Sequence, residues 1–320
     1  MKDSHIPYIH IIHTVCISTM SIKNIDNQPM LNVWSILSRP PYEADEKAIL
    51  TKMVEDYQMP VTHLNNFLDM MRGGPSVFLE QNLLRFPQTK TVANVYGTAM
   101  HKVLEYAHTH LKREGVIPSL EQSFKILEKQ IISGRLNQTD TTIQIDRGKK
   151  ALTLYYKLRL DRIDAENKIE VDFKHQGVLL GDTRITGKID KMVFKGNQIS
   201  VYDFKTGKPK FSWKGIDSYS YLQLHMYKRQ LIFYKLLVEN SRQYKNYEVN
   251  HGSLEFLEPY KNDLVDLELF LDKKETERVS DLAKIVYQKI VNLDFPDTAK
   301  YSRDLDGSIA FEDDLLSGAV

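Results

Sequence analysis

The sequence has a single cysteine, Cys16, among its 320 residues. A disulfide framework, a cysteine-rich zinc site and a four-cysteine iron–sulfur cluster are therefore excluded within this chain. The longest apolar stretch near the start, "YIHIIHTVCI", is too short to span a bilayer and lacks the basic segment and cleavage site of a signal peptide. No GxxxxGK[ST] phosphate loop is present either. These absences predict a cytoplasmic protein with no membrane segment, no iron–sulfur cluster and no ATP site in this chain.

The sequence also lacks an excess of either sign of charge, because its formal net charge is only +1. The distribution is less even than the total, since residues 261–320 carry eight Lys and Arg against 14 Asp and Glu. The remaining residues are therefore net positive, which allows a basic surface away from an acidic C-terminal part. A plain scatter of solvated charges explains the same counts equally well.

The pattern of apolar residues predicts an α/β fold with a largely helical N-terminal half. Residues 1–58 show no continuous periodicity of apolar residues and are expected to form an N-terminal appendage, for which the remnant of a larger helicase is one origin. Residues 59–320 are expected to form the main domain. Within that domain the periodicity predicts helices over 94–115, 119–132, 147–160, 220–239 and 275–291, with a polar tail after the last of them. Period-two alternation predicts strands over 168–175, 183–194, 198–205 and 247–257.

The tripeptide Asp-Phe-Lys occurs twice, at 172–174 and at 203–205. Around the first copy, Lys168, Glu170, Asp172 and Lys174 share one face of the strand and apolar residues the other, which is typical of a strand with its charges in water. Around the second copy, Asp203 and Lys205 share a face with apolar residues. Burying charge is costly unless it is paired or binds a metal, so the second copy is the candidate site.

The dipeptide Gly196-Asn197 predicts a two-residue hairpin turn that places Asp190 directly opposite Asp203. Directly opposed Cβ atoms are about 4.5–5.5 Å apart, so two carboxylates could hold one Mg²⁺ or Mn²⁺ ion. Lys205 falls on the same face as Asp203, and an ammonium group there can position a nucleophile or stabilise a phosphoryl transition state. A register slip of one residue would turn Asp190 to the other face.

Four motifs in order resemble the PD-(D/E)XK nuclease superfamily, and specifically its RecB-like branch as fused to the C-terminus of UvrD-type helicases. They are GxxxH with Leu104-Glu105 at 97–105, GxxD at 187–190, DxKTG at 203–207 and QxxxY at 223–227. The resemblance implies a restriction-endonuclease-like core, a small mixed β-sheet flanked by helices.

Carried onto this sequence, the resemblance implies a metal site and a catalytic lysine. The implied metal ligands are His101, Asp190, Asp203 and the backbone carbonyl of Phe204, and the implied catalytic groups are Lys205, Asp190 and Asp203. Glu105, Gln223 and Tyr227 would support the site or contact DNA, although amphipathic packing explains the spacing of Gln223 and Tyr227 equally well. The cysteines that bind an iron–sulfur cluster in some relatives are absent.

The expected function is metal-dependent hydrolysis of DNA, as an exonuclease in repair or recombination beside a UvrD-type helicase. The loop "KTGKPKFSWK" interleaves basic and aromatic residues, which suits single-stranded nucleic acid, but a plain surface loop has the same composition. Two alternatives remain: a catalytically inactive DNA-binding or helicase-docking module of the same fold, and a phosphatase acting on small substrates.

Overall fold

The computed structural model describes residues 46–320. Most of the predicted N-terminal appendage, residues 1–58, therefore lies outside the described residues, and its boundary stays a prediction. Contacts group residues 51–320 into one unit. No helix among residues 46–320 combines the length and the apolar character that crossing a bilayer requires.

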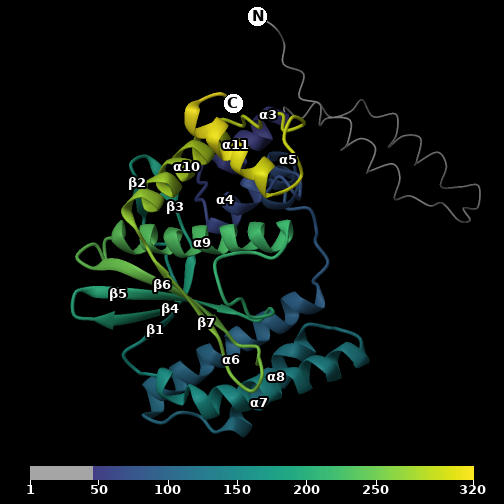
Figure 1. The fold of residues 1–320 in the computed structure, drawn as a ribbon, viewed down its shortest axis with the longest axis vertical. Helices are drawn as coiled ribbons and strands as arrows, with labels where there is room; N and C mark the ends of the chain where they lie inside the picture. Colours follow the sequence, from purple (N-terminus) through teal and green to yellow (C-terminus); the bar gives the residue numbers. More distant parts are fainter. Residues whose placement is uncertain (1–45) are drawn as a thin grey trace, which may run out of the picture. The chain divides into compact units, whose positions relative to one another are not determined.

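The described chain begins with helices, continues with strands and alternates between the two toward its end (Figure 1). The helices are α3 (Glu46–Val54), α4 (Val61–Leu68), α5 (Gly74–Phe78), the π-helical turn η1 (Leu79–Leu83), α6 (Val92–Glu114), α7 (Leu120–Ser133), α8 (Gln138–Leu158), the 3₁₀ turn η2 (Leu160–Arg162), α9 (Ser218–Glu239), α10 (Lys273–Val291) and α11 (Leu305–Ser317). The strands are β1 (Lys168–Asp172), β2 (Val178–Leu180), β3 (Thr183–Ile185), β4 (Lys188–Lys195), β5 (Gln198–Lys205), β6 (Glu248–Phe256) and β7 (Asp266–Phe270). The predicted helical N-terminal half is confirmed.

Five strands form a mixed sheet in the order β1-β4-β5-β6-β7. All neighbours are antiparallel except β5 and β6, which run parallel and are joined through α9. A parallel pair needs such a crossover because its second strand must start again at the same edge of the sheet. The predicted class, a small mixed sheet flanked by helices, is confirmed.

The predicted hairpin register between β4 and β5 is confirmed. The paired residues run from Lys195 with Gln198 at the turn to Lys191 with Tyr202, and the next pair in this register is Asp190 with Asp203. At the turn, Gly196 has a φ of +61°, a conformation that side-chain-bearing residues rarely adopt. The turn chemistry therefore fixes the alignment of the two aspartates.

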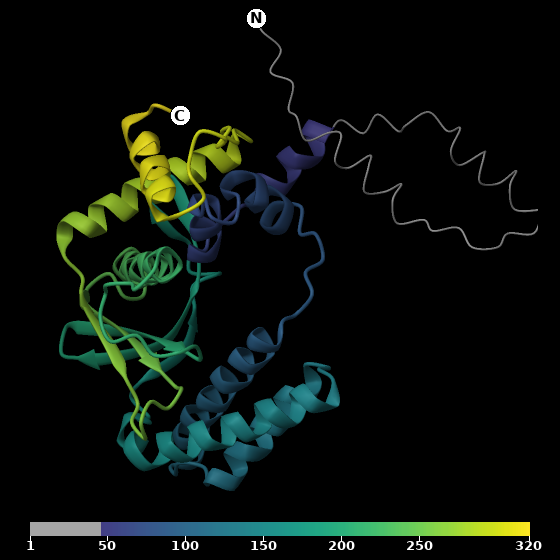
Figure 2. The ribbon, with the colours of Figure 1, turned by 45° about the vertical axis from the view of Figure 1, so that its right-hand side comes forward.

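Helices cover both faces of the sheet (Figure 2). On one face α9 packs on β5 and β6. On the other face, α6, α7 and α8 enclose a core that includes the buried side chains of Leu104, Leu127, Leu152 and Phe204. Asp203 and Phe204 are neighbours on one strand, so their side chains point to opposite faces. Asp203 meets α9, whereas Phe204 joins the core of α6–α8.

Several elements were not predicted from the sequence. Residues 183–194 do not form one strand, because β3 pairs with the unpredicted β2 in a separate two-stranded sheet and β4 begins only at Lys188. The unpredicted β7 completes the edge of the main sheet beside β6. The two strands that were missed, β2 and β7, are only three and five residues long, so each gives few alternating positions.

The expectation of a polar tail after residue 291 was wrong, because α11 is a packed helix. Its Phe311 and Leu315 are buried, and so is Glu312. The Glu312 carboxylate accepts hydrogen bonds from Arg229 and from His225 (2.9 Å) in α9, and pairs with Arg278 in α10 (3.3 Å). Burial disfavours ionisation of Glu312, but these basic groups outweigh it and lower its pKa from 4.5 to about 2.

Candidate active site

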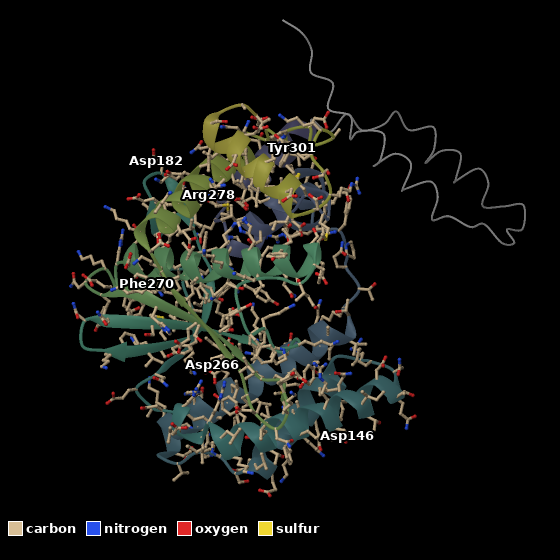
Figure 3. All side chains as sticks on the ribbon, in the orientation of Figure 1. Asp146, Asp182, Asp266, Phe270, Arg278 and Tyr301 are labelled. Atoms are coloured by element: carbon tan, nitrogen blue, oxygen red, sulfur yellow. The ribbon has the colours of Figure 1, made fainter. Side chains whose placement is uncertain are left out.

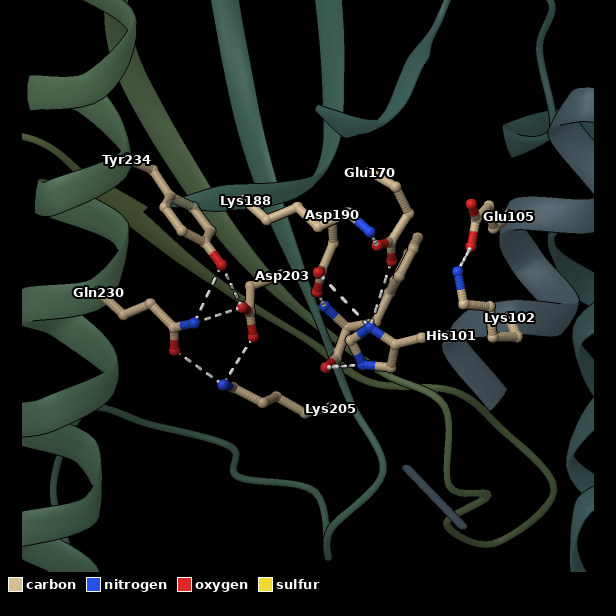
Figure 4. A network of polar contacts seen from close by, with 11 residues as sticks. His101, Lys102, Glu105, Glu170, Lys188, Asp190, Asp203, Lys205, Gln230 and Tyr234 are labelled. Atoms are coloured by element: carbon tan, nitrogen blue, oxygen red, sulfur yellow. Dashed lines mark hydrogen bonds and ion pairs between the residues drawn. The ribbon is translucent and has the colours of Figure 1, made fainter. Parts of the chain in front are cut away.

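Asp203 lies buried near the end of β5, facing α9 (Figure 4). Its Oδ1 accepts hydrogen bonds from Gln230 Nε2 (2.7 Å) and from the Tyr234 hydroxyl (2.8 Å). Its Oδ2 forms an ion pair with Lys205 Nζ at 2.6 Å and has no other partner within the described residues. Lys205 Nζ also donates to Gln230 Oε1 (2.9 Å). The Asp203 carboxylate is thus held in one orientation, with Oδ2 facing the Lys205 ammonium group.

Asp190 and His101 hold the peptide group that follows Asp203. Asp190 Oδ2 accepts a hydrogen bond from the backbone N–H of Phe204 (2.7 Å), and His101 Nε2 lies 3.0 Å from the Phe204 carbonyl oxygen. Burial and the nearby Asp203 carboxylate raise the pKa of Asp190. A buried carboxylate whose ionisation is disfavoured by a neighbouring carboxylate makes a site that a cation would stabilise.

His101 faces two carboxylates, from different strands. Its Nδ1 lies 3.4 Å from Asp190 Oδ1 and 3.7 Å from Glu170 Oε1. One potential ligand atom from each of these three residues lies within 4.8 Å of the others. Burial opposes protonation of His101, but Asp190, Glu170 and Asp203 outweigh it and raise the pKa of the ring to about 10. Of the ligands that the sequence predicts, His101 and Asp190 lie in this group with Glu170. Asp203 lies outside the group but acts on His101 and Asp190 through its charge.

Glu170 is a member of this cluster that sequence reasoning missed. It stands in β1 across from Asp190, since its neighbours Ile169 and Val171 pair with Lys191 and Ile189. Its side chain is only 10% exposed and forms an ion pair with Lys188. Burial raises the pKa of Glu170, but His101 and Lys188 outweigh this effect and lower it overall.

The outer face of β1 was predicted to be solvated, and that is wrong for Glu170. Asp172, two residues on, is exposed and accepts a hydrogen bond from its own turn at Lys174 N (2.8 Å), as a solvated position would. The difference arises because α6 covers one end of β1 and brings His101 over Glu170. Glu170 also has an unusual φ of +53°, a local distortion that strand periodicity does not reveal.

Two QxxxY spacings occur in α9, and the one that contacts Asp203 is not the predicted one. Gln230 and Tyr234 bind Asp203, whereas Gln223 and Tyr227 lie seven residues earlier. Tyr227 still meets the site, because Lys205 Nζ lies 4.0 Å from its ring centroid. Gln223 forms no hydrogen bond within the described part of the chain. Seven residues make almost two helical turns, so both pairs share one face of α9.

Glu105 does not bond to the metal-ligand cluster. Its carboxylate instead accepts a hydrogen bond from Lys102, one turn back on α6 (Figure 4). Burial lowers the pKa of Lys188, but Glu170 outweighs this effect and raises the pKa overall. The negative charge of Glu105 adds a smaller increase. Glu105 thus lies at the rim of the site, where it adds negative charge.

The Gly and Thr of the predicted motifs touch each other. A Cβ atom on Gly97 would lie 3.2 Å from Thr206 Oγ1, so the glycine lets α6 approach the end of β5. Arg147 in α8 fastens the same region by donating to the Thr206 carbonyl (2.9 Å) and to Glu258 (3.0 Å). Tyr96, over whose ring Arg147 lies, donates to Glu258 as well (2.5 Å).

A network of buried charges lies on the opposite face of the sheet from Asp203. Lys191, next to Asp190 on β4, donates to Glu255 on β6 at 2.5 Å, and both are almost fully buried. Arg159 binds Asp266 at 2.7 Å and lies 3.4 Å from Glu255. Lys191 Nζ also lies 5.3 Å from the ring centroid of Phe204. The Lys191–Glu255 ion pair thus ties β4 to β6 across β5, on the face of the sheet opposite to Asp203.

The donor set fits a hard divalent cation. Such ions prefer oxygen ligands, and carboxylates with one imidazole suit Mn²⁺ as well as Mg²⁺. His101, Asp190 and Glu170 each offer one ligand atom within 4.8 Å of the others, and Asp203 adds a further buried carboxylate whose Oδ2 pairs with Lys205.

The comparison with known families agrees with this arrangement. The profile of the PD-(D/E)XK nuclease superfamily matches residues 72–303, which include every residue of the cluster. The chain belongs to this superfamily. Among solved structures, this PD-(D/E)XK protein is similar to the crystal structure of SSO0001, with 16% sequence identity and a TM-score of 0.29, over 68% of this chain and 84% of that chain. No curated protein matches it.

Proposed function

We propose that this PD-(D/E)XK protein is a divalent-metal-dependent deoxyribonuclease. The observation that carries the proposal is the cluster of His101, Glu170 and Asp190 beside the Asp203–Lys205 ion pair, in a chain of this superfamily. Superfamily membership supports nuclease chemistry. That the substrate is DNA rather than RNA, and that the metal is Mg²⁺ or Mn²⁺, are parts of the proposal.

His101, Asp190, Asp203 and the Phe204 carbonyl would hold the cation, with Glu170 as a further ligand. A bound divalent ion activates water for attack on a phosphodiester and neutralises the charge that develops on the phosphoryl oxygens. Asp190 and Asp203 would hold the ion near the Lys205 ammonium group, which lies 2.6 Å from Asp203. Lys205 would then bind the scissile phosphate and stabilise its growing negative charge.

Gln230 and Tyr234 would keep Asp203 in the orientation that this chemistry needs, because outer-shell hydrogen bonds orient metal ligands. Tyr227 restrains Lys205 from the other side of its ammonium group. We extend the proposal, on the sequence resemblance, to exonuclease action in DNA repair or recombination beside a UvrD-type helicase.

The test is cleavage of single- and double-stranded DNA in Mg²⁺ or Mn²⁺ by the wild type and by Asp203→Ala and Lys205→Ala. We expect metal-dependent cleavage that falls about 100- to 1,000-fold in each variant. The first Asp-Phe-Lys copy supplies matched controls, since Asp172→Ala and Lys174→Ala change the same residue types at exposed positions and should cleave like the wild type. A wild type that cuts nothing in either metal, yet binds DNA in a salt-sensitive way, would instead support the inactive DNA-binding module.

A further inference from the structure

Two loops leave the sheet beside the active site. Residues 206–217 follow β5 and residues 257–265 follow β6. Because β5 and β6 are parallel and paired to their ends, at Lys205 with Phe256, both loops start from the same edge of the sheet. That edge is where Asp203 and Lys205 lie.

The loops carry aromatic side chains in solvent. Phe211 is 61% exposed and Tyr260 is 43% exposed, and their rings contact each other edge to face with centroids 4.7 Å apart. Beyond the first loop, Tyr219 at the start of α9 is also exposed. Exposed apolar residues that lie together indicate an interaction site.

Four lysines accompany these rings. Lys208, Lys210 and Lys214 lie in the first loop and Lys261 in the second, and none of them forms an ion pair with another residue of the described chain. Lys261 Nζ lies 5.4 Å from the ring centroid of Tyr260.

The acidic groups of the two loops are mostly engaged elsewhere. Asp217 caps α9 by accepting a hydrogen bond from Ser220 N (2.7 Å), and Glu258 binds Arg147 (3.0 Å). Asp263 accepts a hydrogen bond from the N–H of Leu264, although it is exposed. Both loops that carry the aromatic pair therefore also carry lysines without an ion-pair partner among the described residues.

The loops are fastened to the fold at several points. Arg147 bonds both loop starts, at Thr206 and Glu258. The indole N–H of Trp213 donates to the carbonyl of Glu268 on β7 (2.7 Å), so Trp213 anchors the first loop. The rings are thus presented on a preorganised support, which lowers the entropy cost of binding.

We infer that Phe211, Tyr260 and the four lysines form a surface that binds single-stranded DNA and directs it to the active site. This inference rests on the proposed function, and it names the form of the substrate. Bases stack on exposed aromatic rings without regard to sequence, while lysines bind the phosphates. In a duplex the base faces are already stacked on one another, so the rings discriminate in favour of single strands or unpaired ends.

The test measures binding separately from cleavage. Fluorescence anisotropy in Ca²⁺ or EDTA compares a labelled oligothymidylate with a duplex of equal length, for the wild type and for a Phe211→Ala/Tyr260→Ala variant. The loss of two stacking rings should weaken single-strand binding about 10- to 100-fold and change duplex binding much less. A Lys208→Ala/Lys210→Ala variant should weaken binding to both and reduce its salt dependence.

Phe270→Ala is the matched control. Phe270 is 71% exposed but lies at the far end of β7 from Asp266, where the second loop ends (Figure 3), so its loss should leave DNA affinity unchanged. Unchanged single-strand affinity in Phe211→Ala/Tyr260→Ala, or an equal loss for duplex and single strand, would overturn the inference.

The outcome is independent of whether the chain is a nuclease. If the wild type cleaves nothing but the aromatic variant loses single-strand affinity, the binding surface stands and the proposed function fails. If cleavage is confirmed and the aromatic variant binds like the wild type, the proposed function stands and the binding surface fails. Mn²⁺ binding should be equal in the two proteins, because Phe211 and Tyr260 form no contact with the metal-ligand cluster.

Discussion

The two QxxxY pairs of α9 give a prediction that can be tested with near-isosteric changes. Tyr234→Phe removes only the hydroxyl that donates to Asp203 Oδ1 at 2.8 Å. Tyr227→Phe also removes only a hydroxyl, one that forms no hydrogen bond within the described residues, and keeps the ring 4.0 Å from Lys205 Nζ. Tyr234→Phe therefore removes one hydrogen bond to a buried carboxylate, together with the one that the hydroxyl accepts from Gln230 Nε2 (3.0 Å), and Tyr227→Phe removes neither.

The expected magnitude follows from the charge of the acceptor. A hydrogen bond to a charged group contributes about 1.5–3 kcal/mol, and loss of such an outer-shell partner lowers metal affinity or activity about 10- to 100-fold. We therefore expect the apparent affinity for Mn²⁺ at pH 7 to fall within that range in Tyr234→Phe. In Tyr227→Phe the change should stay under about threefold, since the cation–π contact is kept.

The assay is isothermal titration of Mn²⁺ into each variant, with cleavage rates at saturating metal as a second measurement. Urea unfolding checks that each variant is folded. Gln230→Leu and Gln223→Leu extend the comparison to the other half of each pair, and only the former should lower Mn²⁺ affinity. If Tyr227→Phe lowers affinity as much as Tyr234→Phe, the assignment of Asp203 orientation to the second pair is refuted.

Three further predictions concern stability. Gly97→Val should lower the free energy of unfolding in urea by about 1–3 kcal/mol, because the valine side chain would meet Thr206. Gly97→Ala should be near neutral, because the gain of about 1 kcal/mol in helix propensity offsets its contact with Thr206. Equal effects of the two substitutions would contradict the close approach of α6 to β5. Glu312, whose pKa is about 2 when folded against 4.5 when unfolded, should contribute about 3 kcal/mol of stability above pH 4.5 that is lost as the pH falls toward 2; in acid titrations monitored by circular dichroism, Glu312→Gln should lose stability less steeply over that range. Lys191→Met should lower the free energy of unfolding by about 3–5 kcal/mol, because it leaves the buried Glu255 carboxylate with one partner fewer. Adding Glu255→Leu should recover part of this loss of stability. A larger loss in the double variant would refute the coupling between the two residues.

The parts of the site that the sequence predicts are those fixed by local rules. The Gly196-Asn197 turn sets the register of β4 and β5, and alternation then determines the faces of Asp190 and Asp203. His101 is predicted only through the resemblance, because no local rule places a helix residue over a strand. It is the packing of α6 on the Phe204 side that brings the ring there.

The misses share one cause, which is that periodicity gives the direction of a side chain but not what covers it. Glu170 points to the predicted face of β1, yet α6 buries that face. Gln223 and Gln230 point the same way from α9, yet only the latter is deep enough to meet Asp203. In α11 the buried Glu312 makes a packed helix read as polar, because its charge is balanced by residues far away in the sequence.

Arg147 has a consequence for how the protein responds to heat. It is a single side chain of α8 that holds the starts of both loops, at Thr206 and Glu258, while the loops themselves bear exposed rings and unpaired lysines. If warming loosens α8 from the sheet, the loops lose their common support while the ligands on β4 and β5 keep theirs. On the proposed function, DNA binding should then be lost at a lower temperature than metal binding, leaving a state that still holds a cation but no longer captures DNA.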